Sequence, residues 1–203
     1  LWPGNTETLN NFSDLLMKQK RVSELRDILE RAAKADPNNG LLEMLLANCE
    51  RRISLGKEVT DLEARWARGE RNIEVFKELL SKYSEEGNIV KADLLVTQGA
   101  TLFATNVEVL RDVVNYFAVQ SRVPKAIEYG KKLEKLVPDD AEVKLGLAKF
   151  YMASGNRPDF YKYLKDSIRL GGLPMREKIA TEAMFQQIQS EPDFQTAIRP
   201  SSK

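Results

Sequence analysis

Residues 107–140 read VEVLRDVVNYFAVQSRVPKAIEYGKKLEKLVPDD, and the fold can be predicted from this segment. Its apolar residues recur every three or four positions in two segments, with a short polar turn between the segments and a proline near the end. This spacing is typical of two amphipathic helices joined as a hairpin. Similar units surround it, at intervals of 34, 33, 34 and 34 residues, and the units begin at Thr6, Gly40, Ile73, Val107 and Ala141. A period near 34 predicts a stack of helical hairpins.

Each unit is expected to hold two helices with a short turn between them. The units are expected at residues 6–39, 40–72, 73–106, 107–140 and 141–172. We expect first helices over 6–19, 40–54, 72–86, 107–120 and 141–154, and second helices over 22–35, 57–69, 89–104, 123–136 and 158–170. No segment shows the sustained alternation that predicts a strand.

Glycine and proline stand at matching places in several units. Gly87 and Gly155 each end a first helix, where a residue that tolerates a positive φ is favoured. Pro124 and Pro158 are both eighteenth in their units, at the start of a second helix. A proline is tolerated there because the first helical turn has no partner for the missing N–H.

The units resemble the tetratricopeptide repeat (TPR) family, in which W-x2-L-G-x2-Y is followed by A-x3-F and then by P. The third and fourth units carry the matching residues Phe76, Leu79, Leu80, Tyr83, Ala92, Leu110, Val113, Val114, Phe117, Ala126 and Pro138. The closing phrase SEPDFQTAI, residues 190–198, is similar to the ends of many bacterial repeat proteins of this family. The resemblance implies an all-α fold, an α-solenoid wound as a right-handed superhelix of about five TPR-like helical hairpins plus C-terminal capping helices.

The second unit departs from this pattern. It carries Glu50 and Glu63 at places where apolar residues are expected, and Trp66 where a small residue is expected. One interpretation is sequence drift, with Leu62 and Trp66 packing in a shifted register. The other is an irregular hairpin whose Trp66, or whose nearby arginines such as Arg65, meets a partner.

Both ends of the chain differ from the repeats. Residues 1–5, with Trp2 and Pro3, are expected to be the remnant of a preceding repeat or upstream domain, because Pro3 lies one period before Pro37. Residues 173–203 are expected to form a C-terminal helical cap and a tail. In this cap, Ser190 is predicted to be the N-cap of the last helix, and Met184, Phe185, Ile188, Phe194 and Ile198 are expected to cover the last hairpin.

Composition argues against catalysis and against several ligand classes. Lys+Arg 31 against Asp+Glu 30 leaves a net charge of +1, which favours neither nucleic acid nor an anionic membrane. The chain has no histidine, and its one cysteine, Cys49, is expected to be a small core residue. No phosphate-binding glycine motif, cofactor site or Cys/His metal cluster is present in the sequence, and no apolar run is long enough to insert into a membrane. We therefore expect no enzyme activity, no cofactor and no metal.

The concave face of the repeats is the better candidate for a site. The second, fifth, sixth and ninth residues of each repeat unit are expected to face it. From the third and fourth units, the candidate partner-binding residues are Glu74, Lys77, Glu78, Glu108, Arg111, Asp112 and Asn115. The set is mildly acidic, which favours a basic or mixed peptide, whereas the alternative is that these residues are solvated helix faces with no ligand. The Lys/Asn clamp that the family uses for chaperone tails is not matched.

The sequence therefore predicts a non-catalytic scaffold that binds a peptide or partner protein through the concave face. The alternative is an accessory TPR domain of a larger enzyme or of a membrane or envelope protein, with the activity upstream. That alternative draws on the start at Leu1 rather than Met, from which we expect a missing N-terminal part. A third hypothesis is self-association through Trp2 and the first hairpin. The sequence does not indicate a cellular location.

Overall fold

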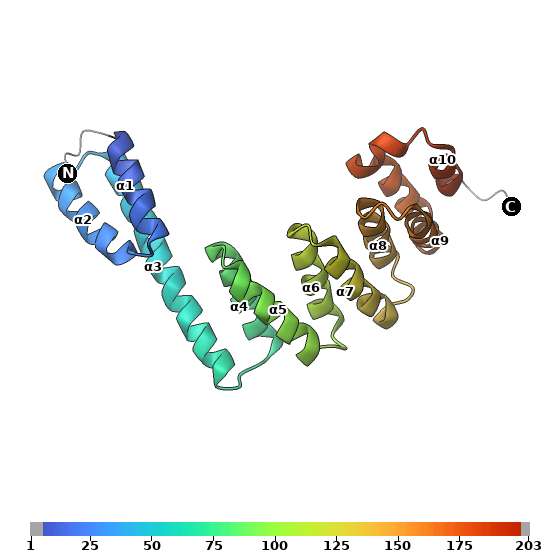
Figure 1. Ribbon diagram of the computed structural model, residues 1–203, viewed down its shortest axis with the longest axis horizontal. Helices are drawn as coiled ribbons and strands as arrows, with labels where there is room; N and C mark the ends of the chain where they lie inside the picture. Colours follow the sequence, from blue (N-terminus) through green and yellow to red (C-terminus); the bar gives the residue numbers. More distant parts are fainter. Residues whose placement is uncertain (1–5, 200–203) are drawn as a thin grey trace. The chain divides into compact units, whose positions relative to one another are not determined.

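The computed structural model describes residues 6–199, and this range holds helices and no strand (Figure 1). The chain divides into two compact parts, each larger than one repeat. They are called unit 1, up to Leu95, and unit 2, from Val96, and the boundary between them falls inside α5 (Ile89–Leu102). The 34-residue units of the sequence pattern are called repeats from here on. The expected all-α fold is confirmed. The remnant expected at residues 1–5 lies outside the described residues.

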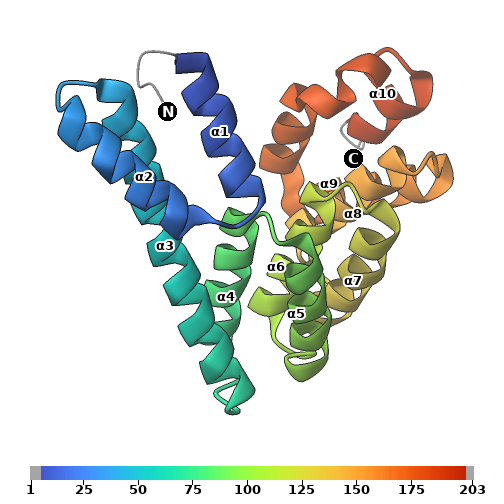
Figure 2. The same ribbon diagram turned by 60° about the vertical axis from the view of Figure 1, so that its left-hand side comes forward.

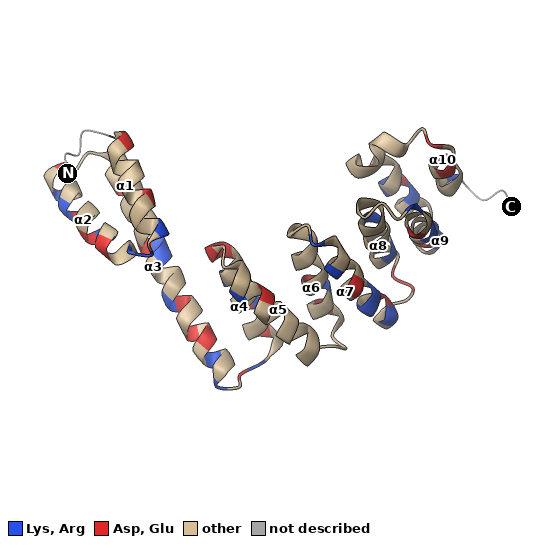
Figure 3. Ribbon diagram, viewed as in Figure 1, with Lys and Arg blue, Asp and Glu red and all other residues tan. Residues whose placement is uncertain are grey.

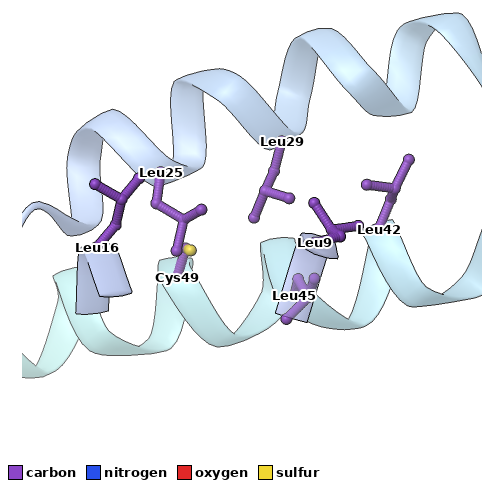
Figure 4. Close-up of a cluster of buried hydrophobic side chains, with 7 residues drawn as sticks. All are labelled: Leu9, Leu16, Leu25, Leu29, Leu42, Leu45 and Cys49. Carbon is purple, nitrogen blue, oxygen red and sulfur yellow. The ribbon is translucent and has the colours of Figure 1, made fainter. Parts of the chain in front are cut away.

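Unit 1 begins with three helices that share one core. They are α1 (Thr6–Lys18), α2 (Val22–Ala35) and α3 (Gly40–Ala67), and α2 packs against both of the others. Their apolar faces meet in a cluster that Figure 4 shows, made of Leu9, Leu16, Leu25, Leu29, Leu42, Leu45 and Cys49. Cys49 is fully buried among leucines, as its sequence context predicted.

The second half of α3 packs on α4 (Ile73–Glu86). The ring of Trp66 lies 6.4 Å from that of Phe76, and both side chains are buried. Tyr83 donates its hydroxyl hydrogen to Glu63, at 2.8 Å, and Lys91 donates to the same carboxylate at 2.6 Å. Leu62 is 5% exposed and Trp66 is 8% exposed. Their burial agrees with the interpretation in which these two residues pack in a shifted register.

The turn expected between two helices of the second repeat is absent, and that prediction is wrong. Helix α3 continues for 28 residues through Ser54 and Gly56, as Figures 1 and 2 show. The eighth residue of a first helix is buried in α1, α6 and α8, whereas the equivalent Ala47 is exposed. Glu50, which broke the sequence pattern, is also exposed. Because the chain does not turn back over this face of α3, a charged residue there remains in water.

Unit 2 contains the regular hairpins. These are α6 (Val107–Val119) with α7 (Val123–Leu136), and α8 (Ala141–Ala153) with α9 (Arg157–Thr181), and α7 also packs on α8. In each hairpin one aromatic ring stacks on another, Phe117 on Tyr129 and Tyr151 on Tyr163, both with ring centroids 5.4 Å apart. The eleventh residue of the first helix thus fills the space against the second helix.

The C-terminal end departs from the repeat where the sequence predicted. Gly172, with φ 61° and ψ −144°, kinks α9, and the short helices η1 (Ala183–Ile188) and α10 (Pro192–Ile198) follow. Phe185 and Phe194 are fully buried, and the ring of Phe185 lies 5.9 Å from both Phe194 and Phe160 of α9, so this segment covers the last hairpin. Two details of the prediction are wrong. Met184 is 46% exposed, and the residue before α10 is Glu191, with no side-chain cap.

Candidate functional site

A small hollow of about 130 Å³ lies in unit 2, where α6, α7 and α8 meet. Arg111, Val114 and Asn115 line it from α6, and Gly130 and Leu133 line it from α7. The α8 side is formed by Glu142, Val143, Gly146, Leu147 and Phe150. Every element that forms the hollow belongs to one unit, so the geometry of the site is defined by unit 2 alone.

Two glycines shape this hollow in opposite ways. A Cβ on Gly130 would lie 2.8 Å from Cδ2 of Leu147, so glycine is what allows α7 to approach α8 closely. A Cβ on Gly146 would meet nothing within 4 Å. Glycine in a helix interior is unfavourable by about 1 kcal/mol relative to alanine. The missing side chain at residue 146 keeps the hollow open, whereas the one at residue 130 serves packing.

The charged groups at the hollow are paired with other parts of unit 2. Arg111 donates to Asp140, the N-cap of α8, which also accepts from the N–H groups of Glu142 and Val143 at 2.9 and 3.0 Å. Partial burial of Asp140 acts against its ionisation, but hydrogen bonds from the Val143 N–H and from Arg111 outweigh it and lower the pKa of Asp140. Lys178 of α9 donates to both oxygens of Glu142 at 2.7 Å.

Asn115 is different from these charged residues. It is exposed at the hollow, and its side-chain amide makes no hydrogen bond within residues 6–199. The remaining lining residues are apolar or glycine, with Phe150 half-buried at the edge. The hollow therefore offers an apolar floor, a neutralised charged rim and one amide with a free donor and acceptor.

The structure brings together two of the residues predicted from the sequence, Arg111 and Asn115, as lining residues of one hollow. Glu108 and Asp112 lie on the same helix, α6, but are not among the lining residues. The other predicted residues are on α4 in unit 1, where Glu74 and Glu78 are exposed and Lys77 is half-buried. Glu78 lies 3.9 Å from Arg65 of α3. The predicted set is therefore divided between the two units.

Sequence reasoning missed the α8 side of the hollow. Glu142 and Gly146 are the second and sixth residues of the fifth repeat, so the rule that selected Arg111 and Asn115 also selects them. Applying this rule beyond the third and fourth repeats would have found both. No sequence feature marks the apolar residues of the hollow as part of a site, because their spacing is that of ordinary core residues.

Two further features bear on the kind of site. Among residues 6–199, no three His, Cys, Asp or Glu side chains come together in a way that could hold a metal ion. None of the helices in this range is both long enough and apolar enough to cross a bilayer.

Comparisons with known proteins place the fold. No protein-family model matches the sequence, and no curated protein matches it. Among solved structures, the chain is similar to YrrB, described as a TPR protein with an unusual peptide-binding site. The TM-score is 0.51 and the identity 14%, over 85% of this chain and 90% of YrrB. It is also similar to MamA, with a TM-score of 0.51 and 19% identity, over 86% of this chain and 96% of MamA.

Both identities are low, so these similarities speak for the architecture. Together with the helical hairpins of the described residues, they show that this chain has an all-α TPR-like repeat fold.

Proposed function

We propose that this chain is a non-catalytic scaffold that binds a peptide, or an exposed segment of a partner protein, at the hollow of unit 2. The observation that carries the proposal is the pairing of an apolar floor with the unengaged amide of Asn115. An apolar side chain of the ligand enters beside Gly146, and Asn115 exchanges hydrogen bonds with the peptide backbone. The peptide-binding site of the structurally similar YrrB supports this kind of role.

The paired rim explains which peptides fit. Arg111 and Glu142 already have partners in Asp140 and Lys178, so neither needs an opposite charge from the ligand. A peptide with an apolar anchor is therefore favoured over one that binds through charge alone, because burying its side chain requires no loss of an existing ion pair.

A displayed library of random peptides, selected against the whole chain, tests this function. We expect the selected peptides to share an apolar anchor and to bind Gly146→Trp at least tenfold more weakly, since the indole fills the hollow. Gly146→Ala is the matched control, because one methyl group leaves most of the space open. Asn115→Ala should weaken binding as well. Peptides that bind Gly146→Trp as tightly as the unchanged chain would place the site elsewhere.

The acidic residues remain a second part of the proposal. We infer that Glu108 and Asp112 on α6 favour basic residues flanking the anchor, and that Glu74, Lys77 and Glu78 on α4 form a separate contact surface in unit 1 that favours basic residues. Asp112→Lys should then lower the affinity for selected peptides that carry lysine or arginine, and Glu78→Lys should lower the affinity of unit 1 for such peptides. If both variants leave these affinities unchanged, the acidic faces are solvent-exposed surfaces without a ligand.

A further inference from the structure

The turns of the repeats follow a regular series that α3 interrupts. Lys20, Gly87, Ser121 and Gly155 all have positive φ, between 55° and 76°, and each ends the first helix of a repeat. The last three follow one another at intervals of 34 residues. The missing member of the series is Ser54, which lies 34 residues after Lys20 and stands inside α3. The turn of the second repeat is replaced by a straight helix.

A hollow of about 470 Å³ lies in unit 1 beside this uninterrupted part of α3. The turn after α1 contributes Lys20 and the first residue of α2 contributes Val22. The middle of α3 contributes Arg51, Arg52, Leu55 and Gly56. The end of α4 and the turn that follows it, residues 85–88, form the remaining side. The hollow thus lies between the turns of the first and third repeats, where the turn of the second repeat is missing.

Exposure along α3 agrees with a gap that no second helix fills. If residues 57–67 folded back on residues 40–54, the face that carries Glu43, Ala47 and Glu50 would be covered. These three residues are exposed, and two of them are carboxylates that would lose their solvation in such a hairpin. The amino-acid sequence of α3 therefore fits the straight helix and an open hollow beside it.

The charges around the hollow are separated by sign. Lys20, Arg51 and Arg52 are basic and come from the first turn and α3, whereas Glu85 and Glu86 come from the end of α4. Figure 3 shows basic residues near the middle of α3 and acidic residues at the end of α4. Within the part of the chain that the structure describes, none of these five side chains makes an ion pair or a hydrogen bond.

The floor of the hollow is apolar and has room at its centre. Leu55 is buried, Met17 and Val22 are half-buried, and a Cβ on Gly56 would meet nothing within 4 Å. An apolar floor between a basic side and an acidic side complements a ligand that carries an acidic, an apolar and a basic group in that order.

The geometry points to a second peptide-binding site in this hollow, which takes a short segment of a partner protein with an acidic, an apolar and a basic side chain. The acidic group contacts Arg51 and Arg52, the apolar group covers Leu55 beside Gly56, and the basic group contacts Glu85 and Glu86. Because the hollow has a basic side and an acidic side, it selects for ligands that carry both charges. A ligand with charges of only one sign is repelled on one side. This site is independent of the hollow in unit 2.

The test follows the backbone amide signals of Gly56 and Gly87 by NMR in the whole isotope-labelled chain. The probe is the pentapeptide acetyl-Glu-Ala-Leu-Ala-Lys-amide, at concentrations up to the millimolar range. Three further peptides are compared with it, one with glutamate at both ends, one with lysine at both ends and one with serine in place of leucine. We expect the mixed-charge peptide with leucine to shift both signals at the lowest concentration.

Two variants and a control complete the test. Arg51→Glu combined with Arg52→Glu should weaken binding of the mixed peptide at least tenfold. Gly56→Leu should do the same by filling the hollow without a change of charge, and it carries the test if the double variant does not fold. Lys57 is an exposed residue of α3 that does not line the hollow, so Lys57→Glu should leave binding unchanged.

The proposal is overturned if no peptide shifts the two signals. Equal binding by the doubly acidic peptide or by Gly56→Leu would also overturn it.

Discussion

Lys144 of α8 is only 8% exposed, and its ammonium group donates to Glu134 of α7 at 2.5 Å. The same carboxylate accepts from the hydroxyl of Tyr163 at 3.0 Å, so Glu134 joins α7 to α8 and α9. In the fourth place of a TPR-like first helix, where the family pattern has a large apolar residue, this chain has a buried lysine. The lysine is accommodated because its charge is compensated by a carboxylate on the neighbouring helix.

This arrangement predicts an asymmetry between the two partners. Glu134→Ala leaves the buried ammonium group unpaired and should lower the free energy of unfolding by about 2 kcal/mol, or more where water cannot enter. Lys144→Met removes the charge and retains most of the packing, so its cost should be about 1 kcal/mol or less. Chemical denaturation of both variants measures the difference. An equal loss in the two variants would contradict the role assigned to the pair.

The pairing of Asp140 with Arg111 predicts a dependence of stability on pH. Because the pKa of Asp140 is lowered in the folded chain, its contribution is fully present above the unfolded value, about 3.9. It is lost as the pH falls from there through the folded pKa. Asp140→Asn should therefore reduce stability at neutral pH and flatten the loss of stability below about pH 4. Urea unfolding between pH 2 and pH 7 tests this, with the exposed neighbour changed in Asp139→Asn as the control.

Ala92 of α5 and Ala47 of α3 test the packing of unit 1. Ala92 is 1% exposed, so Ala92→Leu should overpack the core and cost about 1–3 kcal/mol. Ala47 is exposed because α3 does not turn back, so Ala47→Leu should change stability by less than about 0.5 kcal/mol. Thermal melting of the two variants compares them directly. A large loss for Ala47→Leu would show that this face of α3 is covered after all.

The sequence predicted the hairpins of unit 2 because their local signals agree with one another. Pro124 and Pro158 stand second in α7 and α9, and Gly155 adopts the positive φ expected of it. Ser121 adopts the same conformation without being glycine, so the period and Pro124 locate its turn rather than its own residue type. Of the candidate site, the rule for concave positions located Arg111 and Asn115. The open space beside Gly146 depends on how closely the helices approach, which the sequence pattern does not encode.

The straight course of α3 could not be predicted from the period. The repeat spacing places a turn near Ser54, and the residue type does not exclude one, since Lys20 and Ser121 adopt a positive φ at the matching places. Ser54 nevertheless lies inside α3, and the next residue, Leu55, is buried. The carboxylates Glu43 and Glu50 were the available signal, since they mark a face that no second helix covers. The exposed carboxylates of the second repeat thus accompany its different architecture.

The two glycines at the unit 2 hollow make a paired prediction. Gly146→Ala should raise the free energy of unfolding by about 0.5–1 kcal/mol, because alanine favours the helix and its Cβ meets no atom. Gly130→Ala places its Cβ 2.8 Å from the side chain of Leu147, which is only 1% exposed, so the gain is offset and the variant should be less stable by about 1 kcal/mol. Denaturant unfolding of both variants would contradict this account if Gly130→Ala were the more stable one.

A proline at Lys57 distinguishes the straight α3 from a hairpin. Lys57 is eighteenth in the second repeat, the place that Pro124 and Pro158 occupy in the fourth and fifth repeats. In a hairpin it would stand in the first turn of a second helix, where proline costs little. Inside a continuous helix, proline removes the hydrogen bond to residue 53 and clashes with the preceding turn, at a cost of about 3 kcal/mol. We therefore expect Lys57→Pro to lower the melting temperature strongly and to reduce the helical circular dichroism.

Ser23→Pro is the control, because Ser23 is eighteenth in the first repeat and second in α2. The melting temperature of this variant should remain close to that of the unchanged chain. Equal tolerance of both prolines would mean that α3 breaks near Ser54, and the open hollow of unit 1 would then close.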